Sequence, residues 1–177
     1  MRITKKVIVV NERNEPIGLS EVQKAHTGKG MLHRAFSIFV FNSKGELLLQ
    51  QRSKQKFLWP GFWSETCASH PQEGESLRVS ARKRLKEELG FTCKLSSIGK
   101  LRYEAKYKSI GVEKEICWVF FGKYNRGIAP NPKEVAEIRW MPLKQLKRSI
   151  AQNPWRYTPW MKLQIKKFEK TMEHLLS

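Results

Sequence analysis

The sequence predicts a single α/β domain in which short apolar strands alternate with a few amphipathic helices. Three observations predict this class: a length of 177 residues that fits one hydrophobic core, several β-branched and aromatic runs of strand length, and two segments with apolar residues at helical spacing. No repeat, linker or low-complexity tract divides the chain. We therefore expect residues 1–177 to form one domain with one active site.

The expected strands are short runs rich in valine, isoleucine, leucine and phenylalanine. They cover residues 7–10, 35–41, 46–51, 116–122 and 137–141. The turn residues Asn42-Ser43-Lys44-Gly45 separate the second and third runs and predict a hairpin. The run 116–122 is dense in β-branched and aromatic residues, which is typical of a central strand.

Two segments are expected to be helical. Residues 75–89 place Leu77, Ala81, Leu85 and Leu89 on one face, and Gly90 follows as a typical helix terminator. The tail, about 159–176, begins with a proline that suits a first helical turn and repeats apolar residues at steps of three and four. We expect this basic tail helix to pack on the domain with its lysines in water, rather than to lie on a membrane or a partner helix.

The charge of the chain favours anionic ligands. Lys and Arg number 34 against 16 Asp and Glu, which gives a formal net charge of +18. Such a field attracts anions and steers phosphate-bearing ligands. The basic residues are spread along the chain, without a helix-turn-helix, RNP or zinc-finger pattern, so we expect no nucleic-acid partner.

The N-terminus, the hydropathy and the cysteines favour a cytoplasmic protein. The apolar run at residues 7–10 is broken by Asn11 and Glu12, and no run is long enough to span a bilayer. Cys67, Cys93 and Cys117 form no CxxC pair, so neither a disulfide framework nor a zinc knuckle is expected. For the oligomeric state we expect a monomer.

Histidine and glutamate residues raise the possibility of a metal site. Glu113 and Glu115 stand two apart near the start of a predicted strand, so a period of two directs both carboxylates to one face. His26, His33 and His70 lie in polar or turn-like surroundings. Spacing alone leaves open a solvated strand edge and histidines that share no metal.

Residues 69–91 resemble the Nudix box. The residues that fit are Glu75, Leu85, Glu87, Glu88, Gly90 and Phe91. Ser69 replaces the leading glycine, and Lys83-Arg84 replaces the Arg-Glu pair. The resemblance implies a Nudix-type mixed β-sheet flanked by α-helices. The lost carboxylate argues against pyrophosphate hydrolysis, because a metal-bridging oxygen ligand is missing.

Ordered blocks along nearly the whole chain resemble type I isopentenyl-diphosphate isomerases. The blocks are Ala25-His26-Thr27, Leu32-His33-Arg34-Ala35-Phe36, Trp59-Pro60-Gly61-Phe62-Trp63, Ser69-His70-Pro71, Gly74-Glu75-Ser76, Leu101-Arg102-Tyr103, Val112-Glu113-Lys114-Glu115-Ile116-Cys117 and Thr158-Pro159-Trp160-Met161. The resemblance implies metal-dependent conversion of isopentenyl diphosphate to dimethylallyl diphosphate in isoprenoid biosynthesis.

The resemblance also implies roles for individual residues. His26, His33, His70, Glu113 and Glu115 would form one site for Mn²⁺, Mg²⁺ or Zn²⁺. Glu88 would help to hold a second ion, Mg²⁺, against the diphosphate. Arg52, Lys56 and Arg84 are similar to the family's diphosphate-binding cations.

The implied chemistry adds a proton at one end of an alkene and removes one at the other. Glu115 is similar to the protonating group, Tyr103 to its hydrogen-bond partner, and Trp160 to the indole that stabilises the developing cation.

One position departs from the family in a way that bears on catalysis. Ala68 stands where members carry a reactive cysteine, and Glu65 replaces a typical asparagine. Cys67 is the neighbouring thiol, but an extended segment would direct residues 67 and 68 to opposite faces.

Three interpretations remain open. In the first, the chain isomerises, and its second acid/base is either Cys67, reached through a local bulge, or else water, Ser69 or Glu65. In the second, the chain binds the diphosphate but turns over slowly. In the third, it is a basic Nudix-fold module that binds a diphosphate or nucleic acid. We favour them in that order, because a binding module would not need the metal ligands, Glu115 and Trp160.

Overall fold

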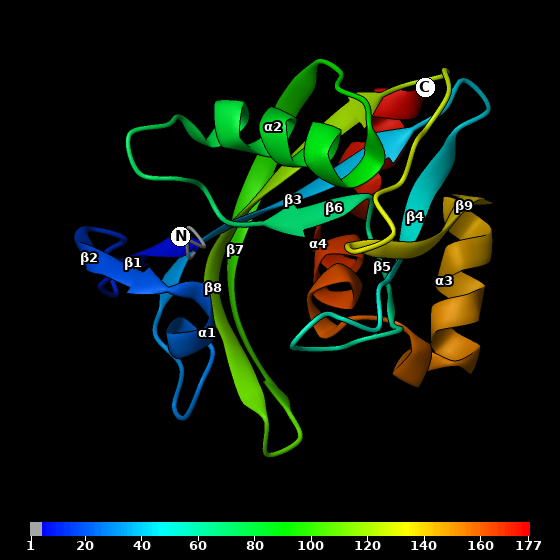
Figure 1. Ribbon diagram of the computed structural model, residues 1–177. Helices are drawn as coiled ribbons and strands as arrows, with labels where there is room; N and C mark the ends of the chain where they lie inside the picture. The colour runs from blue at the N-terminus through cyan, green and yellow to red at the C-terminus, as the bar shows by residue number, and fades with distance from the viewer. Residues whose placement is uncertain (1–4) are drawn as a thin grey trace.

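The computed structural model describes residues 5–177, so the first four residues of the predicted domain lie outside it. Nine strands form one mixed sheet: β1 Lys6–Val10, β2 Pro16–Glu21, β3 His33–Phe41, β4 Glu46–Arg52, β5 Trp63–Ser64, β6 Cys67–Ser69, β7 Leu95–Tyr107, β8 Gly111–Lys123 and β9 Val135–Pro142. The helices are α1 Val22–Ala25, α2 Leu77–Leu89, α3 Leu143–Gln152 and α4 Pro159–Leu176, with a 3₁₀ turn, η1, at Pro154–Arg156 (Figure 1). This mixed sheet with flanking helices confirms the predicted fold class.

Strand β3 is the centre of the sheet. It pairs in parallel with β8 along its whole length, and on its other side it pairs antiparallel with β1, β6 and β4 in turn. Phe36, Ile38 and Val40 pack in one apolar cluster, whereas Phe39 and Phe41 pack in the other. This alternation explains the uninterrupted apolar run, because the strand is buried on both faces.

Helices α2 and α4 cover opposite faces of the sheet (Figure 1). Helix α2 contributes Ala81, Leu85 and Leu89 to one cluster, and α4 contributes residues such as Met161 and Ile165 to the other. Burying each large aliphatic side chain stabilises the fold by roughly 1.5–3 kcal/mol. The two layers hold β3 and β8 rigidly, and these strands carry much of the candidate site.

The predicted strands all exist, with longer bounds, but the predicted hairpin is only partly formed. Strands β3 and β4 pair at Phe41 and Leu47 next to the turn, and β4 then pairs with β9. Thr66 bridges the gap that opens between them. Its Oγ1 accepts a hydrogen bond from the Val40 amide (2.9 Å) and donates one to the Leu48 carbonyl (2.7 Å).

Both predicted helices are confirmed. Helix α2 begins at Leu77, two residues after the predicted start, because Ser76 is extended and caps the helix by accepting from the Val79 amide at 3.3 Å. Gly90 ends it with a left-handed φ of 77°. The tail helix has the predicted bounds. Among residues 5–177, no helix is long and apolar enough to cross a membrane.

Several elements were not predicted, and β7 is the longest of them. Among residues 5–177 this strand pairs only with β8, so it lies at an edge of the described sheet, and many of its side chains are exposed and polar. The same explanation applies to β2, which in the described part of the chain pairs only with β1. Helices α1 and α3 and the short strands β5 and β6 were also missed.

Candidate metal centre and active-site pocket

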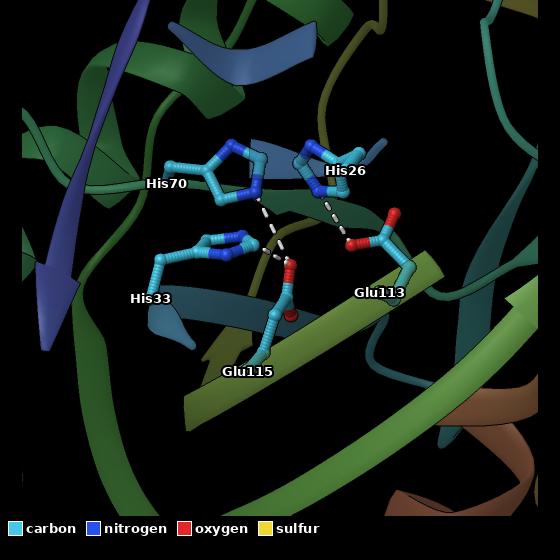
Figure 2. Close-up of side chains that lie close together, drawn as sticks. All are labelled: His26, His33, His70, Glu113 and Glu115. Atoms are coloured by element: carbon cyan, nitrogen blue, oxygen red, sulfur yellow. Dashed lines mark hydrogen bonds and ion pairs between the residues drawn. The ribbon is translucent and has the colours of Figure 1, made fainter. Parts of the chain in front are cut away.

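Five side chains converge at one point of the molecule (Figure 2). They are the predicted metal ligands His26, His33, His70, Glu113 and Glu115, each of which places one nitrogen or oxygen within 4.8 Å of the others. Four of them are buried and His70 is partly buried. These residues could hold a metal ion.

The sheet brings these side chains together from distant parts of the chain. His33 is the first residue of β3 and is the register partner of Glu115 in the parallel pair with β8. His70 follows β6, which pairs with β3. His26 ends α1, and its carbonyl accepts a hydrogen bond of 2.9 Å from the Val112 amide of β8. As their spacing indicates, Glu113 and Glu115 lie on the same side of β8.

The hydrogen bonds around the imidazoles fit a cation at this point. The Nδ1 atoms of His26 and His33 lie 2.6 Å and 2.7 Å from the carbonyl oxygens of Val22 and Met31. Because a carbonyl oxygen only accepts, each Nδ1 donates, which leaves Nε2 of a neutral ring with a free lone pair.

Those lone pairs face carboxylate oxygens. Nε2 of His26 lies 2.7 Å from Glu113, and Nε2 of His33 lies 3.4 Å from Glu115 and has no hydrogen-bond partner within the described chain. Two acceptors that face each other need a proton or a metal cation between them. Imidazole nitrogens together with carboxylate oxygens suit a divalent transition metal or Mg²⁺.

Without a cation, a proton takes that place. Burial acts against a charged His26, but the Glu113 carboxylate raises the pKa of His26 to about 9. Burial and the neighbouring Glu115 raise the pKa of Glu113 above its ordinary value. Burial also opposes ionisation of Glu115, but His33 and His70 hold its pKa well below the usual range. A bound metal would displace the His26 proton.

The cluster opens into a cavity of about 260 Å³. The lining includes Glu113 and Glu115 together with the predicted catalytic residues Tyr103 and Trp160. Tyr103 Oη donates a 2.5 Å hydrogen bond to Glu115 Oε2, and burial and that carboxylate raise the Tyr103 pKa well above its usual value. The pocket therefore combines a hydrogen-bonded tyrosine–carboxylate pair with the aromatic ring of Trp160.

The three predicted diphosphate-binding cations, Arg52, Lys56 and Arg84, also line this cavity. Arg84 forms ion pairs with Glu88 at 2.5 Å and Glu134 at 3.3 Å, and Lys56 pairs with Glu134. Glu134 was missed by the sequence analysis, because nothing in its local sequence separates it from any polar loop residue. The cations are thus shared between the pocket and the protein's own carboxylates.

The structure does not bring Cys67 to the pocket. Residues 67–69 form β6, so Cys67 points into the apolar cluster under α2, where it is fully buried, while Ala68 lines the cavity. Burial raises the pKa of the Cys67 thiol well above its ordinary value. A buried, protonated thiol on the far face is a poor acid/base for a ligand beside Ala68.

Comparisons with known proteins define the class first. The model of the NUDIX domain family matches residues 31–161, and the chain belongs to that family. A Deinococcus radiodurans crystal structure has the same fold, with a TM-score of 0.68 and 20% identity over 84% of this chain and 90% of that one. A Nudix hydrolase from M. smegmatis superposes with a TM-score of 0.56 and 14% identity over 94% of both chains.

Similar curated proteins indicate which kind of NUDIX-domain protein this chain is. The isopentenyl-diphosphate Delta-isomerase of Burkholderia multivorans is 40% identical over 162 residues, covering 92% of both chains. The enzyme of the same name from Nocardia farcinica is 40% identical over 88% of this chain and 89% of its own length. The chain therefore belongs to the isopentenyl-diphosphate Delta-isomerase family.

Proposed function

We propose that this protein is an isopentenyl-diphosphate Delta-isomerase, which converts isopentenyl diphosphate to dimethylallyl diphosphate in isoprenoid biosynthesis. The observation that carries the proposal is one cavity lined by a candidate metal cluster, the Tyr103–Glu115 pair, the Trp160 indole and three basic side chains. The names of its close relatives support it.

The polar parts of the pocket bind metal and diphosphate. The three histidines with Glu113 and Glu115 would hold one divalent cation, Mn²⁺, Mg²⁺ or Zn²⁺, whose positive charge would offset the two adjacent carboxylates. Glu88 is buried in an ion pair with Arg84 and does not line the cavity, so it would help to hold a Mg²⁺ beside the diphosphate only after that ion pair opens. Arg52, Lys56 and Arg84 then bind the phosphate oxygens through charge-assisted hydrogen bonds.

The acid/base pair acts on the hydrocarbon part of the substrate. Glu115 takes up a proton from solvent before the reaction, delivers it to the terminal methylene carbon, and returns to the carboxylate form that Tyr103 holds in place through its hydrogen bond. Addition of that proton leaves a tertiary cation at the other carbon of the former double bond. The indole of Trp160 stabilises this cation by up to roughly 2 kcal/mol when water is excluded.

The second proton leaves the carbon next to the diphosphate-bearing one. Ala68 offers only a methyl group there, and Cys67 lies on the opposite face of β6. We assign the second proton transfer to water in the space beside Ala68, so the reaction proceeds at a reduced rate. The alternative of a basic binding module has no specific observation in its favour.

The deciding experiment follows deuterium by NMR. The purified protein is incubated with isopentenyl diphosphate and Mg²⁺ in deuterated water, and we expect dimethylallyl diphosphate with deuterium in a methyl group. Glu115→Gln abolishes incorporation, whereas Glu137→Gln, which changes an exposed carboxylate on β9, retains it. Absence of incorporation in the wild type, or full incorporation in Glu115→Gln, would refute the proposal.

We also propose that residues 1–177 act as one cytoplasmic domain, as a monomer and without a nucleic-acid partner. Light scattering at working concentration measures the mass directly, and 20.8 kDa is the expected value.

A further inference from the structure

A carboxylate lies buried behind the aromatic wall of the pocket. Glu65 follows β5, is fully buried and does not line the cavity. Its oxygens accept hydrogen bonds from Ser37 Oγ at 2.5 Å, Ser64 Oγ at 2.5 Å and Trp160 Nε1 at 3.1 Å. The proposed reaction gives this group no role. Burial raises the pKa of Glu65, whereas the hydrogen bonds from Ser37 and Ser64 and the nearby Arg52 act to lower it and so favour the carboxylate.

The hydrogen bond between Glu65 and Trp160 has only one possible direction. An indole N–H only donates, so Glu65 Oε2 is the acceptor and the ring edge is held against a negative group. Ser37 is held in turn by Gln164 Nε2 at 2.9 Å, and Ser64 lies 3.1 Å from Thr158 Oγ1. Both of these partners flank Trp160 in sequence, so the network fixes the start of α4.

A positive group acts on the same ring from its face. The Arg52 guanidinium carbon lies 5.3 Å from the centroid of the Trp160 ring, and the Trp59 ring meets it edge-on at 5.1 Å. A guanidinium over the face competes for the π electrons that a substrate cation would use. A carboxylate at the N–H edge has the opposite effect, because it pushes electron density toward the ring.

We propose that Glu65 is a positioning residue for Trp160, whose carboxylate fixes the indole plane and strengthens the negative potential of the ring face toward a cation in the pocket. The inference rests on the proposed function, because that function places a carbocation beside Trp160.

The variant Glu65→Gln removes the negative charge of this side chain but keeps its size. The amide oxygen can still accept from Trp160 while the NH₂ group donates to Ser37, so the geometry is kept and the negative charge is lost. We expect kcat to fall about tenfold with KM for isopentenyl diphosphate unchanged, since the lost interaction acts on the cationic transition state.

A binding measurement tests the inference without turnover. Dimethylaminoethyl diphosphate carries an ammonium where the reaction places positive charge, and isopentyl diphosphate is its neutral isostere. Titration calorimetry should give about tenfold weaker binding of the ammonium compound to Glu65→Gln and at most about a twofold change for the neutral one. Equal losses for the two compounds, or no loss for either, would overturn the inference.

Two further variants separate positioning from stability. Thr66→Val removes the buried hydrogen bonds of the next residue, which contacts neither Glu65 nor Trp160 through its hydroxyl, so it should lower stability but keep the preference for the ammonium compound. In a Trp160→Phe background, Glu65→Gln should no longer change that preference. If it still does, Glu65 does not act through the indole.

The results also separate this inference from the proposed function. A wild type that prefers the ammonium compound but incorporates no deuterium would refute turnover and leave the role of Glu65 intact. An active wild type whose Glu65→Gln variant is equally fast and equally selective would refute the role of Glu65 alone. If Glu65→Gln fails to fold, Glu65→Asp is the substitute variant, because it keeps the negative charge. We expect Glu65→Asp to fold and to retain the preference for the ammonium compound. Loss of that preference in Glu65→Asp would count against the inference.

Discussion

Ala68 is the position at which the proposed reaction lacks a side-chain acid/base. Its methyl group lines the cavity beside the candidate metal cluster, where a thiol would be within reach of a bound alkene. We expect Ala68→Cys to raise kcat by roughly a hundredfold, because a positioned acid/base contributes about 10²–10⁴-fold. The deuterium NMR assay measures the change.

Cys67 provides the control for that variant. Since its thiol lies in the apolar cluster under α2, Cys67→Ala should leave turnover within about a factor of two while lowering stability slightly. A large loss of activity in Cys67→Ala would mean that β6 rearranges to bring this thiol to the substrate. An unchanged rate in Ala68→Cys would contradict the assignment of the missing acid/base to that position.

Glu134 is a second residue with a testable effect. Although partial burial acts in the opposite direction, Lys56, Arg84 and Lys5 lower the pKa of Glu134 to about 2, so it is ionised at neutral pH and occupies the cations that the diphosphate needs. Glu134→Gln should therefore tighten the binding of inorganic pyrophosphate about three- to tenfold in the absence of metal. Titration calorimetry measures the affinity, and Glu137→Gln serves as the matched control; weaker binding to Glu134→Gln would show that this carboxylate supports the anion site.

At the scale of elements, the candidate metal site connects four parts of the fold. Its ligands lie on β3 and β8 and directly after α1 and β6, and none of these parts supplies more than two of them. A cation bound only in the folded state stabilises the native protein by mass action. The same cation would keep the ends of these elements in register.

Metal removal should therefore lower stability. We expect a chelator to reduce Tm by about 5 °C and added Mn²⁺ to restore it, which corresponds to about 1–2 kcal/mol of unfolding free energy for a domain of this size. Differential scanning fluorimetry measures the shift. His26→Asn, which removes one ligand, should make Tm insensitive to both additions, and a chelator shift of full size in that variant would exclude the cluster as the site.

At the scale of the whole molecule, the net charge of +18 should speed the capture of an anionic substrate. We expect kcat/KM for isopentenyl diphosphate to fall several-fold between about 20 and 200 mM salt, with kcat nearly constant, because ions screen long-range attraction. Steady-state kinetics at constant Mg²⁺ measures both quantities. A kcat/KM that does not change with salt would show that the net charge does not speed the capture of the substrate.

The local sequence determined the elements that are buried on a regular face. The apolar runs of β3, β4 and β8 and the spacing in α2 and α4 predicted those elements, because burial imposes a period on the side chains. Strands β2 and β7 escaped prediction because edge strands with exposed faces have a weaker pattern. The predicted β3–β4 hairpin is paired only next to its turn, because β4 pairs with β9 instead. The turn sequence Asn42–Gly45 contains no information about that second partner.

For the site, the sequence by itself determined that Glu113 and Glu115 share a face, since a strand's period of two requires it. Their meeting with three histidines was implied only by resemblance. The parallel pairing of β3 with β8 places His33 beside Glu115, and the hydrogen bond from the Val112 amide to the His26 carbonyl brings His26 to 2.7 Å from Glu113. The tertiary structure alone placed Glu134 among the cations and Glu65 against the Trp160 indole. These contacts join residues that are far apart in the sequence. No local pattern predicts them, because they arise only when packed layers bring distant segments together.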